Sequence, residues 1–273
     1  MQLGLFVRNM GPQSTRASLV ACARAAEAAG VDDLWVADHI AIPPDDAEGS
    51  DGRYLDPLAT LAFLAAATDR IRLGTGVLVL PYRPALPTAK WIATIQELSQ
   101  DRLLLGVGAG WMEAEFRALG VPRARRGAVT DETLGFLVRC FAADEVEAHG
   151  QRFVFRPRPQ RPPIFVGGAP PHALRRAVRY GDGWMPIALD AAMLTEPIAA
   201  LQRRARAAGR DALDVVLVTT LPVDDRVRAR DVVQELAGVG VTRVVHGWRY
   251  ADAGEFARVA DGMGTHLRAA LGR

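Results

Sequence analysis

Residues 71–110 read IRLGTGVLVLPYRPALPTAKWIATIQELSQDRLLLGVGAG, and they contain the pattern from which the fold can be inferred. Two short apolar runs, 71–80 and 102–110, flank a segment, 84–99, in which apolar residues recur every three or four positions. A short continuous apolar run is typical of a strand covered on both faces, and the longer spacing is typical of an amphipathic helix. The stretch therefore predicts one strand–helix–strand unit of a parallel sheet.

The same alternation extends over the rest of the chain. Six further apolar runs predict strands at 3–7, 33–37, 163–168, 183–188, 214–221 and 242–247. Helical spacing follows each strand and predicts helices at 18–30, 56–68, 172–181, 194–209, 227–240 and 255–271. After the apolar run 102–110, it predicts a split helical region from 112 to about 142. The helix at 18–30 ends on a glycine suited to the C′ position.

One segment, 145–155, interrupts the alternation and predicts a small β-hairpin that turns at His149 and Gly150. The remaining elements form eight strand–helix units without a dinucleotide-binding fingerprint. Eight units favour an α/β fold of the (β/α)₈ TIM-barrel type, formed by a single domain over 1–273, whose active site lies at the C-terminal ends of the strands. A doubly wound open sheet is the weaker alternative.

Composition excludes several classes of protein. The chain has 273 residues, 49% of them hydrophobic, and a net charge of +2, which predicts a folded protein that binds neither nucleic acid nor a membrane. We expect a cytoplasmic location, with Cys22 and Cys140 as buried free thiols. Lys90 is the only lysine and lies in a predicted helix, so Schiff-base chemistry is not expected.

Candidate catalytic residues follow the second predicted strand, in the segment LWVADHI (34–40). Asp38 and His39 fall at the mouth of the predicted barrel, where a functional role is favoured over simple solvation. A metal site is not expected, because His246 is the only other histidine at a strand end. The chain also lacks a G-x-S-x-G nucleophile motif.

Glycines near three strand ends predict a ligand. Gly74 and Gly76 interrupt one apolar run, the segment LGVGAG (105–110) follows, and Gly167 and Gly168 lie between a strand and a helix. Glycine within a strand marks a bulge or close approach of a ligand, and bare N–H groups near a helix start can hold a phosphate. These features favour a flat, flavin-like ring with a phosphate tail.

The chain resembles the luciferase-like monooxygenase superfamily, and within it the branch of probable F420-dependent oxidoreductases. The stretches that carry the resemblance include AEAAGVDDLWVADHI, YLDPLATLAFLAAATDRIRLGTGVLVLPYRPALPTAK, LSQDRLLLGVGAGWMEAEFRALG and PPIFVGGAPPHALRRAVRYGDGW. The resemblance implies the deazaflavin coenzyme F420 as cofactor, with FMN as the alternative, because members that use either share the scaffold.

The resemblance also implies roles for single residues. Asp38 would hydrogen-bond the edge of the ring and His39 would act as the proton relay. The cofactor would further contact the bulge at Gly76 and Val77, where members commonly have a cis peptide bond, and the residues Gly108, Ala109, Gly110, Gly167 and Gly168. Arg176, together with Arg123, Arg125, Arg126 and Arg175, could attract the acidic tail of the coenzyme.

Trp111 marks a departure from one branch of the superfamily. Sugar-phosphate dehydrogenases carry a glutamate at this position, so that activity is not expected. Trp111 is predicted to line the substrate pocket, with a place in the core as the alternative. Glu113 and Glu115 follow closely, and at a helix start they are expected to be surface residues that complement the helix dipole.

The leading hypothesis is an oxidoreductase that transfers a hydride between F420 and an unidentified small organic substrate. The second is a monooxygenase that uses reduced FMN and oxygen, and the third is a flavin-binding protein without activity. A phosphate-binding isomerase is a fourth, weaker possibility. We expect a homodimer formed through the helices on the barrel surface.

Overall fold

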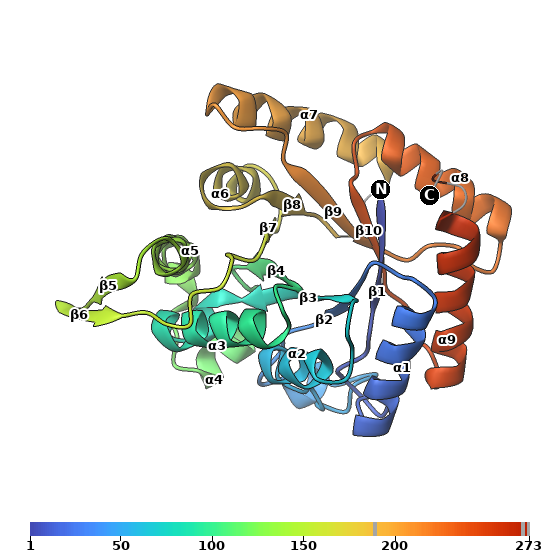
Figure 1. Ribbon diagram of the computed structural model, residues 1–273, viewed down its shortest axis with the longest axis horizontal. Helices are drawn as coiled ribbons and strands as arrows, with labels where there is room; N and C mark the ends of the chain where they lie inside the picture. Colours follow the sequence, from blue (N-terminus) through green and yellow to red (C-terminus); the bar gives the residue numbers. More distant parts are fainter. Residues whose placement is uncertain (188–189, 269–270, 272–273) are drawn as a thin grey trace.

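The computed structural model describes residues 1–187, 190–268 and 271. Eight parallel strands form a closed barrel in the order β1-β10-β9-β8-β7-β4-β3-β2 (Figure 1). The first strand pairs with both β2 and β10, which closes the sheet. The predicted TIM barrel is confirmed, with strands β1 (Gln2–Phe6), β2 (Asp33–Val36), β3 (Arg72–Val79), β4 (Leu103–Gly108), β7 (Ile164–Gly167), β8 (Gly183–Met185), β9 (Asp214–Thr219) and β10 (Arg243–His246).

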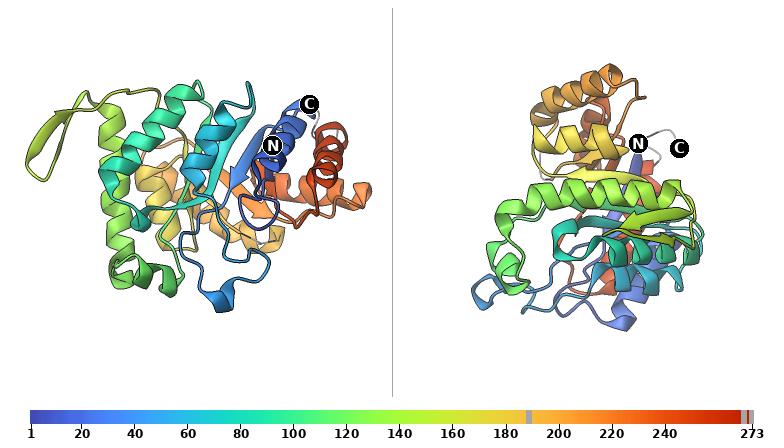
Figure 2. Two further views of the ribbon diagram at one scale, coloured as in Figure 1. Left: turned by 90° about the horizontal axis from the view of Figure 1, so that it is seen from below. Right: turned by 90° about the vertical axis from the view of Figure 1, so that its left-hand side faces the viewer.

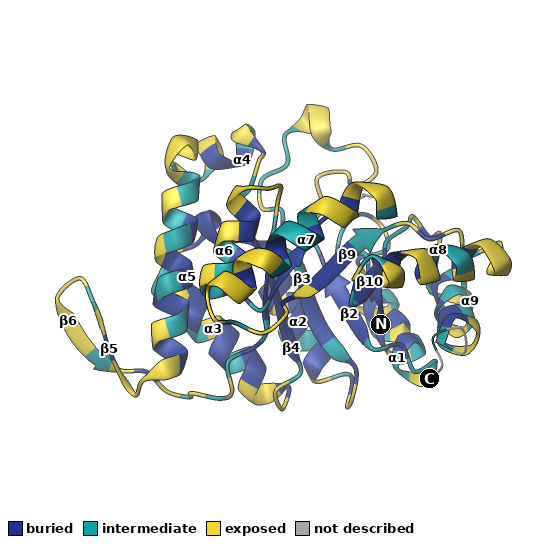
Figure 3. Ribbon diagram, turned by 90° about the horizontal axis from the view of Figure 1, so that it is seen from above, coloured by how far each residue is buried: buried dark blue, intermediate teal, exposed yellow. Residues whose placement is uncertain are grey.

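Helices surround the barrel and turn their exposed faces outward, while the strands of the barrel are mostly buried (Figure 3). They are α1 (Arg16–Ala28), α2 (Pro57–Ala65), α3 (Ala85–Leu98), α4 (Glu113–Ala118), α5 (Arg126–Ala142), α6 (His172–Tyr180), α7 (Ala191–Ala207), α8 (Arg226–Gly238) and α9 (Ala253–Gly262). Short 3₁₀ turns η1 (Pro44–Asp46), η2 (Leu80–Tyr82) and η3 (Arg123–Arg125) and a π-helical turn η4 (Met263–Leu267) complete the connections. None of the described helices is both long enough and apolar enough to cross a membrane.

Two predicted elements extend past what the structure describes. The predicted strand 183–188 ends at Met185, and residue 188 lies outside the described residues. The predicted helix 255–271 is observed as α9 and η4, and residues 269 and 270 lie outside the described residues. The predicted split helical region after β4 is observed as α4, η3 and α5.

Local sequence sets where the helices begin and end. Asp56 caps α2 by accepting a hydrogen bond from the Ala59 amide at 3.0 Å, and Asp190, Asp225 and Asp252 cap α7, α8 and α9 in the same way. After α1, Gly30 adopts a φ of 73°. A side chain is strained in that left-handed conformation, so this glycine ends the helix as predicted.

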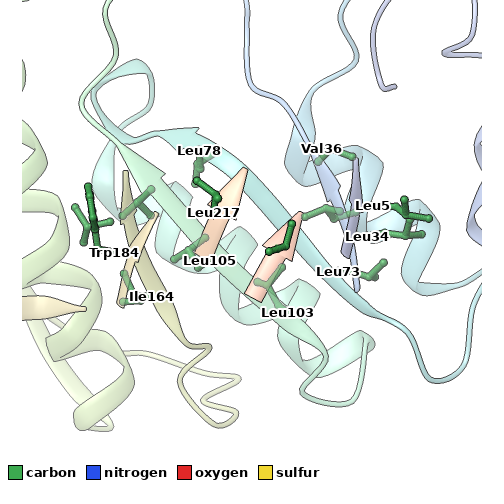
Figure 4. Close-up of a cluster of buried hydrophobic side chains, with 14 of the residues drawn as sticks. Leu5, Leu34, Val36, Leu73, Leu78, Leu103, Leu105, Ile164, Trp184 and Leu217 are labelled. Carbon is green, nitrogen blue, oxygen red and sulfur yellow. The ribbon is translucent and has the colours of Figure 1, made fainter. Parts of the chain in front are cut away.

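The core has two layers. An outer layer lies between the strands and the helices, and Figure 4 shows part of it. An inner layer fills the barrel with Trp35, Leu104, Phe165, Met185, Val216 and Val245. A Cβ atom on Gly74 would clash with the Trp35 ring, and one on Gly106 would lie 2.0 Å from the Thr75 carbonyl oxygen and 2.7 Å from the Met185 sulfur. These two glycines therefore make room for the barrel core rather than for a ligand, which corrects the reading of Gly74 from the sequence.

The predicted hairpin is confirmed. Strands β5 (Glu145–Ala148) and β6 (Gln151–Val154) pair antiparallel, and the turn residues His149 and Gly150 have φ values of 52° and 77°. Positive φ at both turn positions is the geometry that suits the right-handed twist of a two-residue hairpin. The hairpin projects from the barrel beyond one end of α5 (Figures 1 and 2).

Candidate active site

A cavity of about 900 Å³ opens at the C-terminal ends of β2, β3, β4 and β7. This volume falls within the range of natural small-molecule and cofactor sites. Its walls include eleven of the residues that the sequence analysis assigned to catalysis, cofactor binding or the substrate pocket: Asp38, His39, Gly76, Val77, Gly108, Ala109, Gly110, Trp111, Gly167, Gly168 and Arg176. The barrel thus gathers residues that lie far apart in the chain at the end where such barrels carry their active sites.

His39 is held by a carboxylate. Its Nδ1 lies 2.8 Å from Oε2 of Glu115. The same oxygen accepts a hydrogen bond from the Tyr82 hydroxyl at 2.7 Å. Oε1 of Glu115 accepts hydrogen bonds from the backbone amides of Ile40 and Ala41 at 2.5 and 3.0 Å. Glu115 therefore ties the loop after β2 to η2 and to α4.

The expectation that Glu115 is a surface residue is wrong. Helix α4 begins at Glu113, which is exposed as predicted, but it buries Glu115 and Phe116. Together with buried Met112, these residues follow the three- and four-residue spacing of an inward helix face. That spacing is the sequence signal that could have identified Glu115.

Glu115 is ionised in the folded protein at neutral pH. Burial on its own would raise the pKa of this carboxyl. The hydrogen bonds from His39, from the amides of Ile40 and Ala41 and from Tyr82 outweigh burial and lower the pKa of Glu115 to about 2. A permanent negative charge thus lies beside the His39 ring.

Asp38 forms a buried ion pair. Arg83 donates two hydrogen bonds to it, Nη1 to Oδ2 at 2.7 Å and Nη2 to Oδ1 at 2.8 Å, and the Val79 amide donates a third at 2.8 Å. Arg83 also bonds Asp56, the cap of α2, at 2.7 Å. The observed role of Asp38 is to fix the segment before His39. Its predicted contact with the cofactor ring remains a prediction.

Arg83 and Tyr82 were not identified from the sequence. Both lie in the segment LPYRP, directly after the third strand, where barrel residues reach the active-site mouth. Position at a strand end was therefore the available signal, but the partners of these side chains come from other segments of the chain.

Trp111 lies on the cavity wall, with 67% of its surface exposed. A place in the core, the alternative from the sequence, is therefore wrong. The Trp111 ring meets the His39 ring edge-on at a centroid distance of 6.4 Å, and the Tyr54 ring approaches His39 at 5.0 Å. Two aromatic rings thus flank the imidazole, and of the two Trp111 also lines the cavity.

Val77 projects between two of the glycines that line the cavity. A Cβ on Gly108 would lie 2.6 Å from Val77 Cγ2, and one on Gly167 would lie 3.0 Å from Cγ1. The register between β3 and β4 shifts between Thr75 and Leu78, which is the bulge that the resemblance implied, and the Gly76–Val77 peptide bond is cis. Gly108 and Gly167 therefore make room for Val77, and the backbone around it lines the cavity.

One side of the cavity is basic. Arg126, His172, Arg175 and Arg176 line it near the turn that begins at Gly167 and Gly168. Arg176 is held by Asp131 at 2.8 Å and by the carbonyl oxygen of Gly127 at 3.0 Å. Arg123 and Arg125 are not among the lining residues; Arg125 instead pairs with exposed Glu132. Positive charge beside a helix start suits an anionic group.

The other candidates from the sequence lie away from the cavity. His246 is buried and stacks on Trp248 at a centroid distance of 4.6 Å. Lys90 lies on α3, where its Nζ contacts the Arg156 carbonyl oxygen, and Cys22 and Cys140 are buried free thiols as predicted. The described residues contain no group of three or more His, Cys, Asp or Glu side chains that could hold a metal ion.

Sequence comparison relates the chain to one family over almost its whole length. Residues 1–267 match the family model described as luciferase-like monooxygenase. An uncharacterised protein of Mycobacterium tuberculosis is 34% identical over 248 residues, which is 83% of each chain. The F420-dependent hydroxymycolic acid dehydrogenase of the same organism is 33% identical over 209 residues, covering 71% of this chain and 55% of that one.

Solved structures share the fold. An F420-dependent secondary alcohol dehydrogenase in complex with an F420-acetone adduct aligns with a TM-score of 0.83 at 18% identity, over 98% of both chains. The oxygenating constituent of 3,6-diketocamphane monooxygenase from Pseudomonas putida, in complex with FMN, aligns with a TM-score of 0.81 at 14% identity, over 99% of this chain and 98% of that one. At these identities the likeness establishes the fold alone.

Proposed function

The chain belongs to the luciferase-like monooxygenase family, and we propose that it transfers a hydride between coenzyme F420 and a small organic substrate. Relatives in this family use F420 or a flavin. The observation that carries the proposal is His39, a proton-carrying group held by Glu115 at the wall of a cofactor-sized cavity. Hydride transfer to or from an oxygen-bearing carbon requires such a group, because a proton must move with the hydride.

The cavity fits a deazaflavin by its chemistry. An apolar surface around Val77 suits a flat ring, and the basic side at Arg126, Arg175 and Arg176 suits a phosphate and an acidic tail. When bound, the cofactor supplies or accepts the hydride at its C5. The likeness to the F420-dependent hydroxymycolic acid dehydrogenase supports the same choice.

The residues of the chain would divide the remaining work. His39 would hold or release a proton at its ring nitrogen, and the Asp38–Arg83 pair would keep the segment before it in place. Trp111 and Tyr54 would exclude water from the face where the substrate lies. Their rings, rather than charged groups, favour a substrate that is uncharged at its reacting end.

Cofactor titration of the purified protein tests the proposal. We expect binding to quench the fluorescence of F420 or of the protein. We also expect F420 to bind at least about tenfold more tightly than FMN, a difference of about 1.4 kcal/mol. Arg175→Gln should weaken F420 binding, most clearly at low salt, whereas Arg179→Gln, one turn later on α6, should not. FMN binding without deazaflavin binding would overturn the choice of cofactor and favour the monooxygenase hypothesis.

A substrate screen separates an enzyme from a binding protein. Alcohols, imines and enones would be offered with oxidised or reduced F420, and cofactor absorbance would be followed. We expect turnover with at least one class and its loss in His39→Ala. Turnover that is unchanged in His39→Ala would contradict the assigned role of His39, and cofactor binding without any turnover would favour the non-catalytic hypothesis.

A further inference from the structure

We infer that Glu115 is a positioning residue that fixes His39 as the tautomer with its proton on Nδ1, so that Nε2 exchanges the proton with the substrate. The assignment of the tautomer stands on contacts within the chain. The exchange with a substrate rests on the proposed function.

The contact between Glu115 and His39 admits one arrangement of the proton. An ionised carboxylate only accepts hydrogen bonds, and Oε2 of Glu115 lies 2.8 Å from Nδ1 of His39. Nδ1 must therefore donate. The hydrogen bonds that lower the pKa of Glu115 to about 2 keep the carboxylate ionised at neutral pH.

The carboxylate is itself fixed from three sides. Tyr82 donates to Oε2 from η2, and the amides of Ile40 and Ala41 donate to Oε1 from the loop that carries His39. Glu115 has 0% exposed surface, so water does not compete for these bonds. Three donors besides His39 thus hold one buried carboxylate in a single orientation, and the His39 ring takes its orientation from that carboxylate.

Nε2 is the nitrogen left for chemistry. Among the described residues no side chain or backbone group hydrogen-bonds to it, and His39 lines the cavity with 21% of its side chain exposed. Tyr54 and Trp111 flank the ring. The negative charge on the neighbouring Asp38 is paired with Arg83, whereas the charge on Glu115 lies in direct contact with the imidazole.

This arrangement defines the proton step in both directions. In the oxidation of an alcohol, Nε2 of His39 would accept the proton of the breaking O–H bond, while the C–H hydride would be taken up by the bound deazaflavin, so that a carbonyl group forms. In the reverse direction Nε2 returns the proton to the carbonyl oxygen as the carbon gains the hydride. Glu115 balances the positive charge of the ring while Nε2 holds its proton.

Nitrogen NMR tests the tautomer without any cofactor. In protein labelled with ¹⁵N-histidine, long-range proton–nitrogen spectra distinguish Nδ1–H from Nε2–H, and His39→Gln assigns the signals. We expect Nδ1–H in the wild type. In Glu115→Gln the side-chain oxygen can keep accepting hydrogen bonds from the two backbone amides. The NH₂ group then points toward His39. Nδ1 must then accept, so the proton should move to Nε2.

Two variants keep this test decisive. Glu113→Gln changes the exposed glutamate of the same helix and should leave the tautomer unchanged. Tyr82→Phe removes one donor to Glu115 but leaves the carboxylate, so it should also keep Nδ1–H, which still tests the proposal if Glu115→Gln does not fold. An Nε2–H wild type, a Glu115→Gln spectrum like that of the wild type, or loss of Nδ1–H in Tyr82→Phe would overturn the proposal.

Kinetics then separate positioning from a structural role. Glu115→Gln should lower kcat/KM by about 10²–10⁴-fold, the usual contribution of general acid–base catalysis, and should alter its pH profile. Its affinity for F420 should stay unchanged, and Glu115→Asp should restore part of the rate. If the wild type binds no F420, the proposed function fails, yet the NMR result still decides the tautomer. Normal kcat/KM in Glu115→Gln would overturn the role of Glu115 in the proton step.

Discussion

Arg83 donates two parallel hydrogen bonds to Asp38, at 2.7 and 2.8 Å, across 45 positions of sequence, and both side chains are buried. The pair joins the end of β2 to the residue directly after η2. Because a guanidinium presents its donors in a rigid fork, this geometry fixes the carboxylate in direction as well as in distance. The segment that leads to His39 is therefore attached to the neighbouring strand by charge.

Removing Arg83 should destabilise the fold. Arg83→Met leaves the Asp38 carboxylate buried without its partner, which typically costs about 3–5 kcal/mol in the free energy of unfolding. Urea unfolding at pH 7 measures the change. The double variant Arg83→Met/Asp38→Asn should recover part of the loss, because no unpaired charge remains. Arg125→Gln, which breaks the exposed pair with Glu132, should change stability by no more than about 1 kcal/mol. Equal losses of stability in Arg83→Met and Arg125→Gln would contradict this prediction.

Gly108→Ala should damage the cavity more than the fold as a whole. The added Cβ would lie 2.6 Å from Val77 Cγ2, so Val77 must shift and change the surface that we assign to the cofactor ring. We expect weaker F420 binding, measured by fluorescence titration. Gly238→Ala is the matched control, because it ends α8 with nothing within 4 Å of its Cβ, and it should leave binding unchanged. Wild-type affinity in Gly108→Ala would argue against ring contact at Val77.

Part of the loss of folding stability at acidic pH should come from protonation of Glu115. Its pKa is about 2 in the folded protein and near its ordinary value of 4.5 when unfolded, so the folded state binds fewer protons between these values. The stabilisation is fully present above pH 4.5 and is lost as the pH falls toward 2. Glu115→Gln should therefore be less stable than the wild type at pH 7, and the gap should narrow at pH 3. Urea midpoints measure it, with Glu113→Gln following the wild type; a gap that is independent of pH would contradict the assigned shift.

His246 should contribute a second acid dependence, in a higher pH range than that of Glu115. Burial lowers the pKa of His246 to about 4 from an ordinary 6.5, so the unfolded chain takes up a proton here that the folded protein does not. Stability from this source is complete above pH 6.5 and declines as the pH falls toward 4. His246→Phe removes the titrating group and should flatten the stability curve in that window. His149→Asn, in the exposed hairpin turn, should leave the curve unchanged.

The sequence by itself determined the barrel and the place of the site. Strand and helix periodicity is a local property that survives without knowledge of partners, so the eight units, the hairpin and the position of Asp38 and His39 at a strand end could be predicted. The glycines near the strand ends could also be predicted to make room for a bulky group, but for several of them that group is a side chain and not a ligand. Gly74 accommodates Trp35, and Gly108 and Gly167 accommodate Val77. A glycine shows where a side chain is not tolerated, and it does not show what occupies the space.

Only the tertiary structure decided which side chains meet. Glu115 lies 76 positions from His39 and Arg83 lies 45 from Asp38, and these pairs form because β2, β3 and β4 pair side by side in parallel, which brings their C-terminal ends together. A carboxylate in the first turn of a helix is expected to be exposed when only its place at the helix start is considered. Whether it is buried depends on the donors that another strand end supplies, and the folded barrel surrounds Glu115 with four of them.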